Sequence, residues 1–344
     1  MTLRINLALQ GGGAHGAFTW GVLDRLLDED DVEVSAISGT SAGALNGAAF
    51  KAGMVSGGRE AARKNLDWLW EQIGAQGDMR LTHWMTALSP APGLVSQALE
   101  YSLPFSIMET ASRITSPYAL GPFYRNPLDG IARRLQYDKV CAHEGPALFI
   151  SATNVRTGKI RVFEYEEITP EVLMASACLP TLFQAVEFTD PKTGKEEAFW
   201  DGGYMGNPAL FPLFPKAFPD DIVIVNINPL YRDALPKTPQ DILNRINEIS
   251  FNSSLLRELR SIQVAREHAG TKGKSANEVT DANIHMIADD DLMTSLSVAT
   301  KMVPTPVVLG QLKTSGHAAA DRFLKDHKAS IGKTSSINLE SMFD

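Results

Sequence analysis

The pentapeptide Gly39-Thr40-Ser41-Ala42-Gly43 decides how we expect this chain to fold. It follows a short apolar run at residues 34–37 and opens a stretch of small residues at 44–49. This order predicts a strand, a very tight turn and a helix, which would hold the Ser41 hydroxyl clear of the backbone at the positive end of the helix. Alone, the motif is also compatible with an inert turn, so its meaning depends on two further glycine motifs.

The first of these motifs is Gly11-Gly12-Gly13-Ala14-His15-Gly16, which joins an apolar strand at residues 4–9 to a helix at 17–27. The run satisfies G-x-G-x-x-G, and in dinucleotide-binding proteins such glycines cradle a pyrophosphate. That function also needs an acidic residue at the end of the second strand, which here ends in Ile37-Ser38-Gly39. The same N–H groups could instead hold the oxyanion of an acyl-transfer intermediate. We favour the oxyanion interpretation because Ser41 is only one helix and one strand away.

The second motif, Asp201-Gly202-Gly203, follows a strand–turn–strand pattern over residues 186–200. An aspartate followed by glycines at a strand end is often only a turn. It is also a way to set a carboxylate at the rim of a sheet with room beside it. The motif therefore offers Asp201 as a partner for Ser41.

Composition limits the class of protein. The chain has 344 residues, 44% of them hydrophobic, and a net charge of −8, which indicates a globular protein and argues against nucleic acid as a partner. Cys141 and Cys178 have no metal or redox spacing. The N-terminus lacks a signal-peptide pattern, and no apolar stretch reaches 18 residues, so we expect a cytoplasmic protein without a transmembrane helix.

Periodicity and turn residues predict alternating strands and helices that later mix, without repeats or a Pro/Ser-rich linker. We therefore expect one α/β domain over residues 1–344, in which 231–344 adds helices and a strand. Further helices are expected at 56–76, 126–135, 170–179, 239–269 and 306–329, and further strands at 147–153, 159–165, 221–226 and 284–288.

Residues 77–124 differ from the rest of the chain. They are rich in Met, Trp, Phe and Leu, are broken by prolines, and have no clear helical or strand period. Such a segment is either ordinary packing or a cap over an apolar-substrate cleft. As a cap it would cover Ser41 and meet lipid, with Trp84 and Phe105 among its contact residues.

Taken together, the three glycine motifs resemble the signature blocks of patatin-like phospholipases, and Ser176-Ala177-Cys178-Leu179-Pro180 resembles a further block. The resemblance covers about residues 1–230. It implies a three-layer α/β/α fold with a mainly parallel central sheet, a Ser–Asp dyad in place of a Ser–His–Asp triad, and hydrolysis of acyl esters, often of phospholipids. One departure is His15, where the family usually has Arg or Lys. A constant positive charge beside the oxyanion hole would become a pH-dependent one.

The resemblance assigns roles to these residues. Ser41 would attack the acyl carbonyl while Asp201, made more basic by partial desolvation, takes its proton. His15 is a candidate modulator through its charge, and no cofactor or metal is expected. The oxyanion donors would come from Gly11, Gly12, Gly13, Ala14 and Ala42, and the remaining motif residues are Gly16, Gly39, Gly43, Gly202 and Gly203.

Three alternatives stay open. A histidine-based triad would use a histidine after the acid, but none lies in a glycine-rich loop after a strand. A lipid-binding scaffold on the same fold and a dinucleotide-dependent oxidoreductase are the other function classes. For the hydrolase we expect a lipid or acyl-ester substrate and transient contact with a membrane surface. The histidines that follow the acid are His268, His285, His317 and His327.

Overall fold

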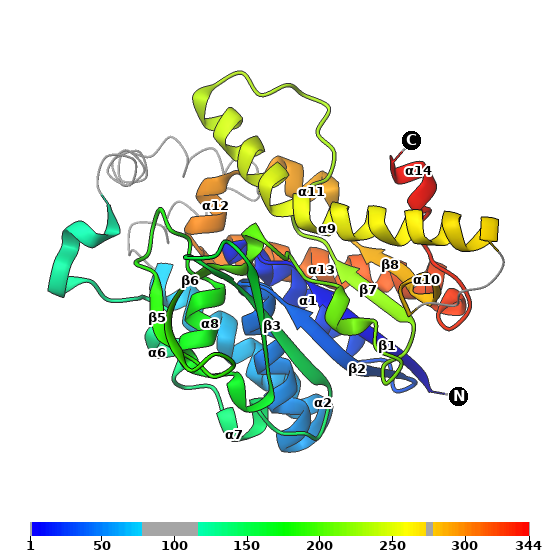
Figure 1. The fold of residues 1–344 in the computed structure, drawn as a ribbon, viewed down its shortest axis with the longest axis horizontal. Helices are drawn as coiled ribbons and strands as arrows, with labels where there is room; N and C mark the ends of the chain where they lie inside the picture. Colours follow the sequence, from blue (N-terminus) through cyan, green and yellow to red (C-terminus); the bar gives the residue numbers. More distant parts are fainter. Residues whose placement is uncertain (1, 78–115, 273–277, 344) are drawn as a thin grey trace.

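Figure 1 shows the computed structural model of the chain, which describes residues 2–77, 116–272 and 278–343. Its centre is an eight-stranded sheet of order β5-β6-β3-β2-β1-β7-β8, with β4 paired to β3 outside this path. The strands are β1 (Leu3–Leu9), β2 (Val32–Gly39), β3 (Ala147–Asn154), β4 (Ile160–Glu164), β5 (Val186–Asp190), β6 (Lys195–Asp201), β7 (Asp221–Val225) and β8 (Asn283–Ile287).

Helices connect these strands and cover the sheet. The α-helices are α1 (Ala17–Leu26), α2 (Ala42–Gly77), α6 (Asp129–Ala132), α7 (Tyr137–Val140), α8 (Pro170–Ser176), α9 (Pro239–Lys272), α10 (Glu278–Asp281), α11 (Asp290–Ser295), α12 (Val298–Met302), α13 (Pro306–His327) and α14 (Leu339–Phe343). Short 3₁₀ helices are η1 (Gly13–Gly16), η2 (Pro117–Phe123), η3 (Tyr165–Glu167), η4 (Gly202–Tyr204), η5 (Phe211–Leu213) and η6 (Lys328–Ser330).

The middle of the sheet is parallel. β1 pairs in parallel with β2 and β7, β2 with β3, and β7 with β8, while β4, β5 and β6 join by antiparallel pairing. The predicted α/β fold with a mainly parallel sheet is thus confirmed. Because β1 and β2 are parallel neighbours, the loops that leave their carboxyl ends meet at one edge of the sheet, where ligands of such folds usually bind.

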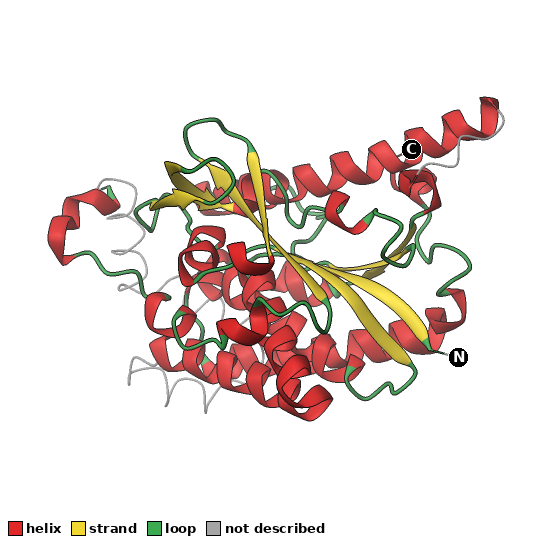
Figure 2. Ribbon diagram, turned by 60° about the horizontal axis from the view of Figure 1, so that its bottom comes forward, coloured by secondary structure: helices red, strands yellow, loops and turns green. Residues whose placement is uncertain are grey.

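Successive side chains along a strand point to opposite faces of the sheet, and each face packs against its own layer of helices. Leu7 and Leu9 of β1 belong to a buried cluster with α1, α2 and α13, whereas Ala8 belongs to a second cluster with α9 and α14. Figure 2 shows the same arrangement, with the sheet between the long α9 and the larger group of helices. The three-layer arrangement predicted from the resemblance is present.

Two helix boundaries differ from the prediction. The helix expected at 56–76 is continuous with the one after Ser41, and α2 is interrupted only by non-helical backbone at Gly57 and Gly58. Gly270, expected to stop the long helix, lies inside α9. Among the described residues, no helix is long and apolar enough to span a bilayer.

The predicted cap lies mostly outside the described residues. Of residues 77–124, the described part is Gly77, at the end of α2, and 116–124, which include η2. Trp84 and Phe105 lie outside it, so the cap stays a prediction.

Candidate active site

Ser41 occupies the turn between β2 and α2. Its φ is 53°, in the left-handed region that few non-glycine residues adopt, and its side chain is buried. Such a backbone costs on the order of 1–3 kcal/mol and is found mainly at functional positions. A Cβ atom at Gly43 would lie 2.1 Å from the carbonyl oxygen of Leu9, so only glycine lets the new helix start this close to β1. Gly39 in turn lies against the backbone of Gly43.

Asp201 ends β6 and faces Ser41. Its side chain is buried, accepts the N–H of Gly203 at 2.7 Å and lies close enough to the Ser41 hydroxyl for this hydroxyl to affect its pKa. Burial raises the pKa of Asp201 to about 7, although the Gly203 N–H and the Ser41 hydroxyl both lower it. Gly202 leaves room for the turn, since a Cβ atom there would lie 2.2 Å from the Ser151 carbonyl oxygen. The structure thus places the two residues that the sequence proposed as a pair beside each other, and burial raises the pKa of the carboxyl group.

Ser176, at the end of α8, holds the backbone of the nucleophile. Its hydroxyl accepts the N–H of Ser41 at 2.9 Å and donates to the carbonyl of Ser151 in β3 at 2.7 Å. The sequence placed Ser176 in a family-like motif but gave it no role. The contact could not be read from the sequence because the two serines are 135 residues apart.

The glycine-rich loop packs directly on the Ser41 turn. A Cβ atom at Gly11 would lie 2.6 Å from that of Ser41, and one at Gly16 would lie 2.5 Å from that of Ala42. Ala42 begins α2, so its N–H has no acceptor within the helix. Among the described residues, the N–H groups of Gly12, Gly13 and Ala14 also have no acceptor. The glycine-rich loop and the start of α2 thus offer four amides as potential donors.

Gly11 does not fit the role expected for it. Its N–H donates to Oδ1 of Asn207 at 2.7 Å, so this amide is already satisfied. The expectation that Gly11 supplies an oxyanion donor is therefore wrong for this conformation. Its contribution is the absence of a side chain where the loop touches Ser41.

Buried amide side chains hold this loop in place. Asn228 donates through Nδ2 to the Gly11 carbonyl at 2.9 Å, and its own N–H donates to Gln10 Oε1 at 3.0 Å. Gln10 also donates through Nε2 to Asn252 of α9 at 3.1 Å. Sequence reasoning missed this network. Its one local signal was Gln10, a polar residue between an apolar strand and the glycine run.

His15 is buried and neutral, which contradicts its expected role as a pH-dependent charge. Its Nε2 lies 2.8 Å from the Thr300 hydroxyl, which itself donates to the Ser297 carbonyl. The Thr300 oxygen must therefore accept a hydrogen bond from the Nε2–H of His15. Burial, with the nearby charges of Lys301 and Arg232, moves the pKa of His15 well below its usual value. We thus expect no charge change at His15 near neutral pH.

The other histidines contact different parts of the molecule. His285 lies 3.0 Å from Asp221, His317 lies 3.9 Å from Asp28, and the ring of His327 packs near Phe323. His268 contacts the carbonyl of Val264 within α9. None of these contacts involves Ser41 or Asp201, and the described residues contain no group of three or more potential metal-binding side chains.

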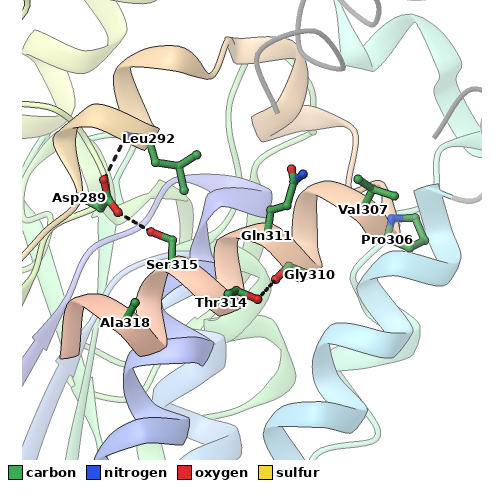
Figure 3. A pocket seen from close by; sticks show the side chains of 9 residues that line it. All are labelled: Asp289, Leu292, Pro306, Val307, Gly310, Gln311, Thr314, Ser315 and Ala318. Carbon is green, nitrogen blue, oxygen red and sulfur yellow. Dashed lines mark hydrogen bonds between the residues drawn. The ribbon is translucent and has the colours of Figure 1, made fainter. Parts of the chain in front are cut away.

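The structure also has a surface groove of about 710 Å³ between α11 and α13, shown in Figure 3. Its carboxylate, Asp289, accepts the Leu292 N–H at 3.0 Å and the Ser315 hydroxyl, so it caps α11. None of the predicted site residues lines this groove. The lining residues are Asp289, Leu292, Pro306, Val307, Gly310, Gln311, Thr314, Ser315 and Ala318.

Comparison with known proteins points to one family. Residues 7–214, more than half of the chain, match the family model described as Patatin-like phospholipase. A search of curated proteins found no match. Similar solved structures include VipD from Legionella pneumophila, at 15% identity and a TM-score of 0.42, covering 95% of this chain and 67% of that one. Another is the type III effector ExoU, at 19% identity and a TM-score of 0.29, covering 96% and 63%. This chain therefore spans about two thirds of these proteins.

Proposed function

Because the chain belongs to the patatin-like phospholipase family, we propose that it is a serine hydrolase that cleaves carboxylic esters of lipids. The observation that carries the proposal is the buried carboxylate of Asp201 beside the Ser41 hydroxyl, which affects its pKa. The glycine-rich loop that packs on the Ser41 turn offers unpaired backbone N–H groups, and acyl transfer requires such donors. The family supports lipid acyl hydrolysis in general terms, and the roles of individual residues are our proposal.

In the first half-reaction the Ser41 oxygen attacks the ester carbonyl carbon while Asp201 takes the hydroxyl proton. The carbonyl oxygen becomes an oxyanion that accepts hydrogen bonds from Ala42 and from Gly12, Gly13 and Ala14. When the intermediate collapses, the bond to the leaving alcohol breaks and Asp201 returns the proton to that alcohol. Water then repeats the sequence on the acyl-enzyme, releasing the fatty acid and restoring Ser41.

Asp201 can act as a base only when it is ionised. Because burial raises its pKa to about 7, roughly half of the molecules would hold the carboxylate ready at neutral pH. A carboxylate with the usual pKa would be ionised throughout this range but would be a much weaker base. Activity should therefore rise with pH up to and beyond 7.

We propose a lipid surface as the partner of the first half of α9. Ile242, Ile246 and Ile249 form an exposed apolar stripe, and Leu235 in the preceding loop is 81% exposed. This part of the molecule projects at the top of Figure 1. The helix that carries this stripe also reaches the active site, because Phe251 packs on Gly203, next to Asp201. The expected site of action, cytoplasmic and peripheral to a membrane, stays a prediction.

Hydrolysis assays test the proposal directly. The wild-type protein should hydrolyse a soluble p-nitrophenyl ester and release fatty acid from phospholipid vesicles, and Ser41→Ala should do neither. A matched control is Ser261→Ala, which removes an exposed serine on α9. Vesicle binding without hydrolysis would instead support the lipid-binding scaffold. Binding of NAD(P)H would support the dinucleotide alternative.

A further inference from the structure

Lys301, at the end of α12, lies beside the glycine-rich loop. A Cβ atom at Gly13 would lie 2.4 Å from the Lys301 carbonyl oxygen, so the two backbones are in contact. The Lys301 ammonium donates to Oδ1 of Asn228 at 2.9 Å. That same oxygen lies 3.7 Å from the Cβ position of Gly12. The Asn228 side-chain oxygen is therefore in contact with the Lys301 ammonium and lies next to the backbone of Gly12 in the glycine-rich loop.

This charge has no direct counterion among the described residues. The acid whose charge acts on it is Glu248 of α9, and the Glu248 carboxylate is already bound by two arginines. Arg232 reaches it at 2.6 and 2.8 Å, and Arg245 at 3.2 Å. Lys301 forms no ion pair with a described carboxylate, and Asn228 occupies only one of the three donors of its ammonium. A part-buried cation of this kind favours negative charge nearby.

We propose that Lys301 is a positioning residue that stabilises the oxyanion electrostatically at the amides of Gly12 and Gly13. This inference rests on the proposed hydrolase function and adds a residue to its site. Lys301 would act through space and through Asn228, which holds the Gly11 carbonyl at 2.9 Å. It provides the positive charge that neutral His15 cannot provide from within the loop.

The inference predicts an alkaline limit to activity. Burial lowers the pKa of Lys301 to about 8, Glu248 opposes this shift, and Arg232 adds to it. Below that pH the ammonium is charged and the oxyanion is favoured; above it the charge is lost and activity falls. Two other titratable groups bear on this pH dependence. His15 of η1 is neutral and adds no charge, and Asp290 of α11 raises the pKa of Arg232, so that Arg232 stays positively charged.

The test measures how fast a neutral fluorophosphonate probe labels Ser41, since this reaction needs the oxyanion hole but no anionic head group. Lys301→Met should slow labelling by about 10- to 100-fold and remove the alkaline limb, in line with the loss of one oxyanion-stabilising group. Lys301→Arg should restore most of the rate and shift the limb to higher pH. Lys51→Met is the matched control, because it removes a lysine that is more deeply buried than Lys301 and lies ten residues after Ser41 in α2, and it should leave the rate unchanged.

Several results would overturn the inference. If the wild-type protein is not labelled at Ser41, both the proposed function and this inference fail. If labelling occurs but is the same in Lys301→Met, only this inference fails. If Lys301→Met slows hydrolysis of anionic phospholipid but not labelling by the neutral probe, Lys301 binds a head group instead. If a variant does not fold, the wild-type pH profile still decides, and the absence of an alkaline limb refutes the proposal.

Discussion

At the scale of one residue, the proposed catalytic group Asp201 lowers the stability of the folded protein. Its pKa of about 7 in the folded protein lies above the ordinary value of 3.8, so folding favours the protonated form. Ionisation of the buried carboxylate therefore lowers the free energy of unfolding. This loss grows as the pH rises from about 4 to 7, is constant above pH 7, and is at most about 4 kcal/mol. The burial that makes Asp201 a stronger base therefore also lowers the stability of the folded protein.

We therefore predict that Asp201→Asn stabilises the protein at pH 8 while abolishing hydrolysis. The gain should shrink as the pH falls and vanish near pH 4, as measured by urea unfolding at several pH values. Asp190→Asn is the matched control. Although burial raises the pKa of Asp190, hydrogen bonds from Arg161 and Lys192 lower it overall, so this substitution should destabilise at pH 8. An Asp201→Asn gain that does not depend on pH would contradict the assigned pKa.

Ser176 carries a second prediction at this scale. Ser176→Ala leaves the buried N–H of Ser41 without its acceptor, which should cost about 1–3 kcal/mol of stability and lower kcat about tenfold or more as the turn shifts. Ser38→Ala removes a similarly buried hydroxyl in β2, which donates to Ala209 instead. It should cost stability but little activity. Equal kcat losses in both variants would argue against a specific role for Ser176.

The sequence predicted well those site residues whose role requires particular residues next to them in the chain. Ser41 and Asp201 stand beside glycines that the tight turns need, so local motifs identify them. Ser176 and Lys301 act through long-range contacts with no local motif, and their partners emerge only from the fold. The expectations for Gly11 and His15 were wrong because a local motif does not reveal their distant partners. The Gly11 N–H is bound by Asn207, and the His15 ring is bound by Thr300.

At the scale of elements, α13 supports the helix that follows the glycine-rich loop. α1 and α13 approach so closely that a Cβ atom at Gly21 would lie 1.9 Å from the Lys313 carbonyl oxygen. One at Gly316 would lie 2.0 Å from that of Phe18. Backbone carbonyls cannot move aside as flexible side chains can. The position of α1, and with it the loop over Ser41, therefore depends on these two glycines.

Gly316→Ala should destabilise the protein by about 1–3 kcal/mol through overpacking. Gly310→Ala on the same helix is the matched control, since a Cβ atom there would meet nothing within 4 Å. It should stabilise by up to about 1 kcal/mol, because alanine favours a helix more than glycine. Thermal unfolding of both variants checks this prediction, and similar effects would contradict the close helix contact.

Element prediction succeeded where periodic patterns were long enough to read. The strands were all anticipated, and α9 and α13 were expected within three residues of their observed ends. The five-residue α12, which carries Lys301, was missed because so short a helix shows no clear period.

At the scale of the whole molecule, the apolar stripe on α9 predicts how the protein meets its substrate. Replacing Ile242, Ile246 and Ile249 by Ser should reduce vesicle binding and phospholipid hydrolysis several-fold, while hydrolysis of a soluble ester should stay within about twofold. With a net charge of −8, binding to a lipid surface would rest on apolar contact.

Val264→Ser is the control for this stripe, because Val264 is also exposed on α9 but lies about 15 residues beyond Ile249. It should leave both activities unchanged. Equal losses on vesicles and on the soluble ester would show that the isoleucines support the active site, rather than contact with lipid.

The central claim is that Ser41 and Asp201 form one catalytic unit, and a double-mutant cycle tests it most directly. kcat/KM for a soluble p-nitrophenyl ester is measured for Ser41→Ala, Asp201→Ala and the double variant, after each is shown to be folded. We predict that each single substitution removes nearly all activity, and that the double variant is little worse than either. Losses that multiply in the double variant would contradict a shared step, and with it the proposed dyad.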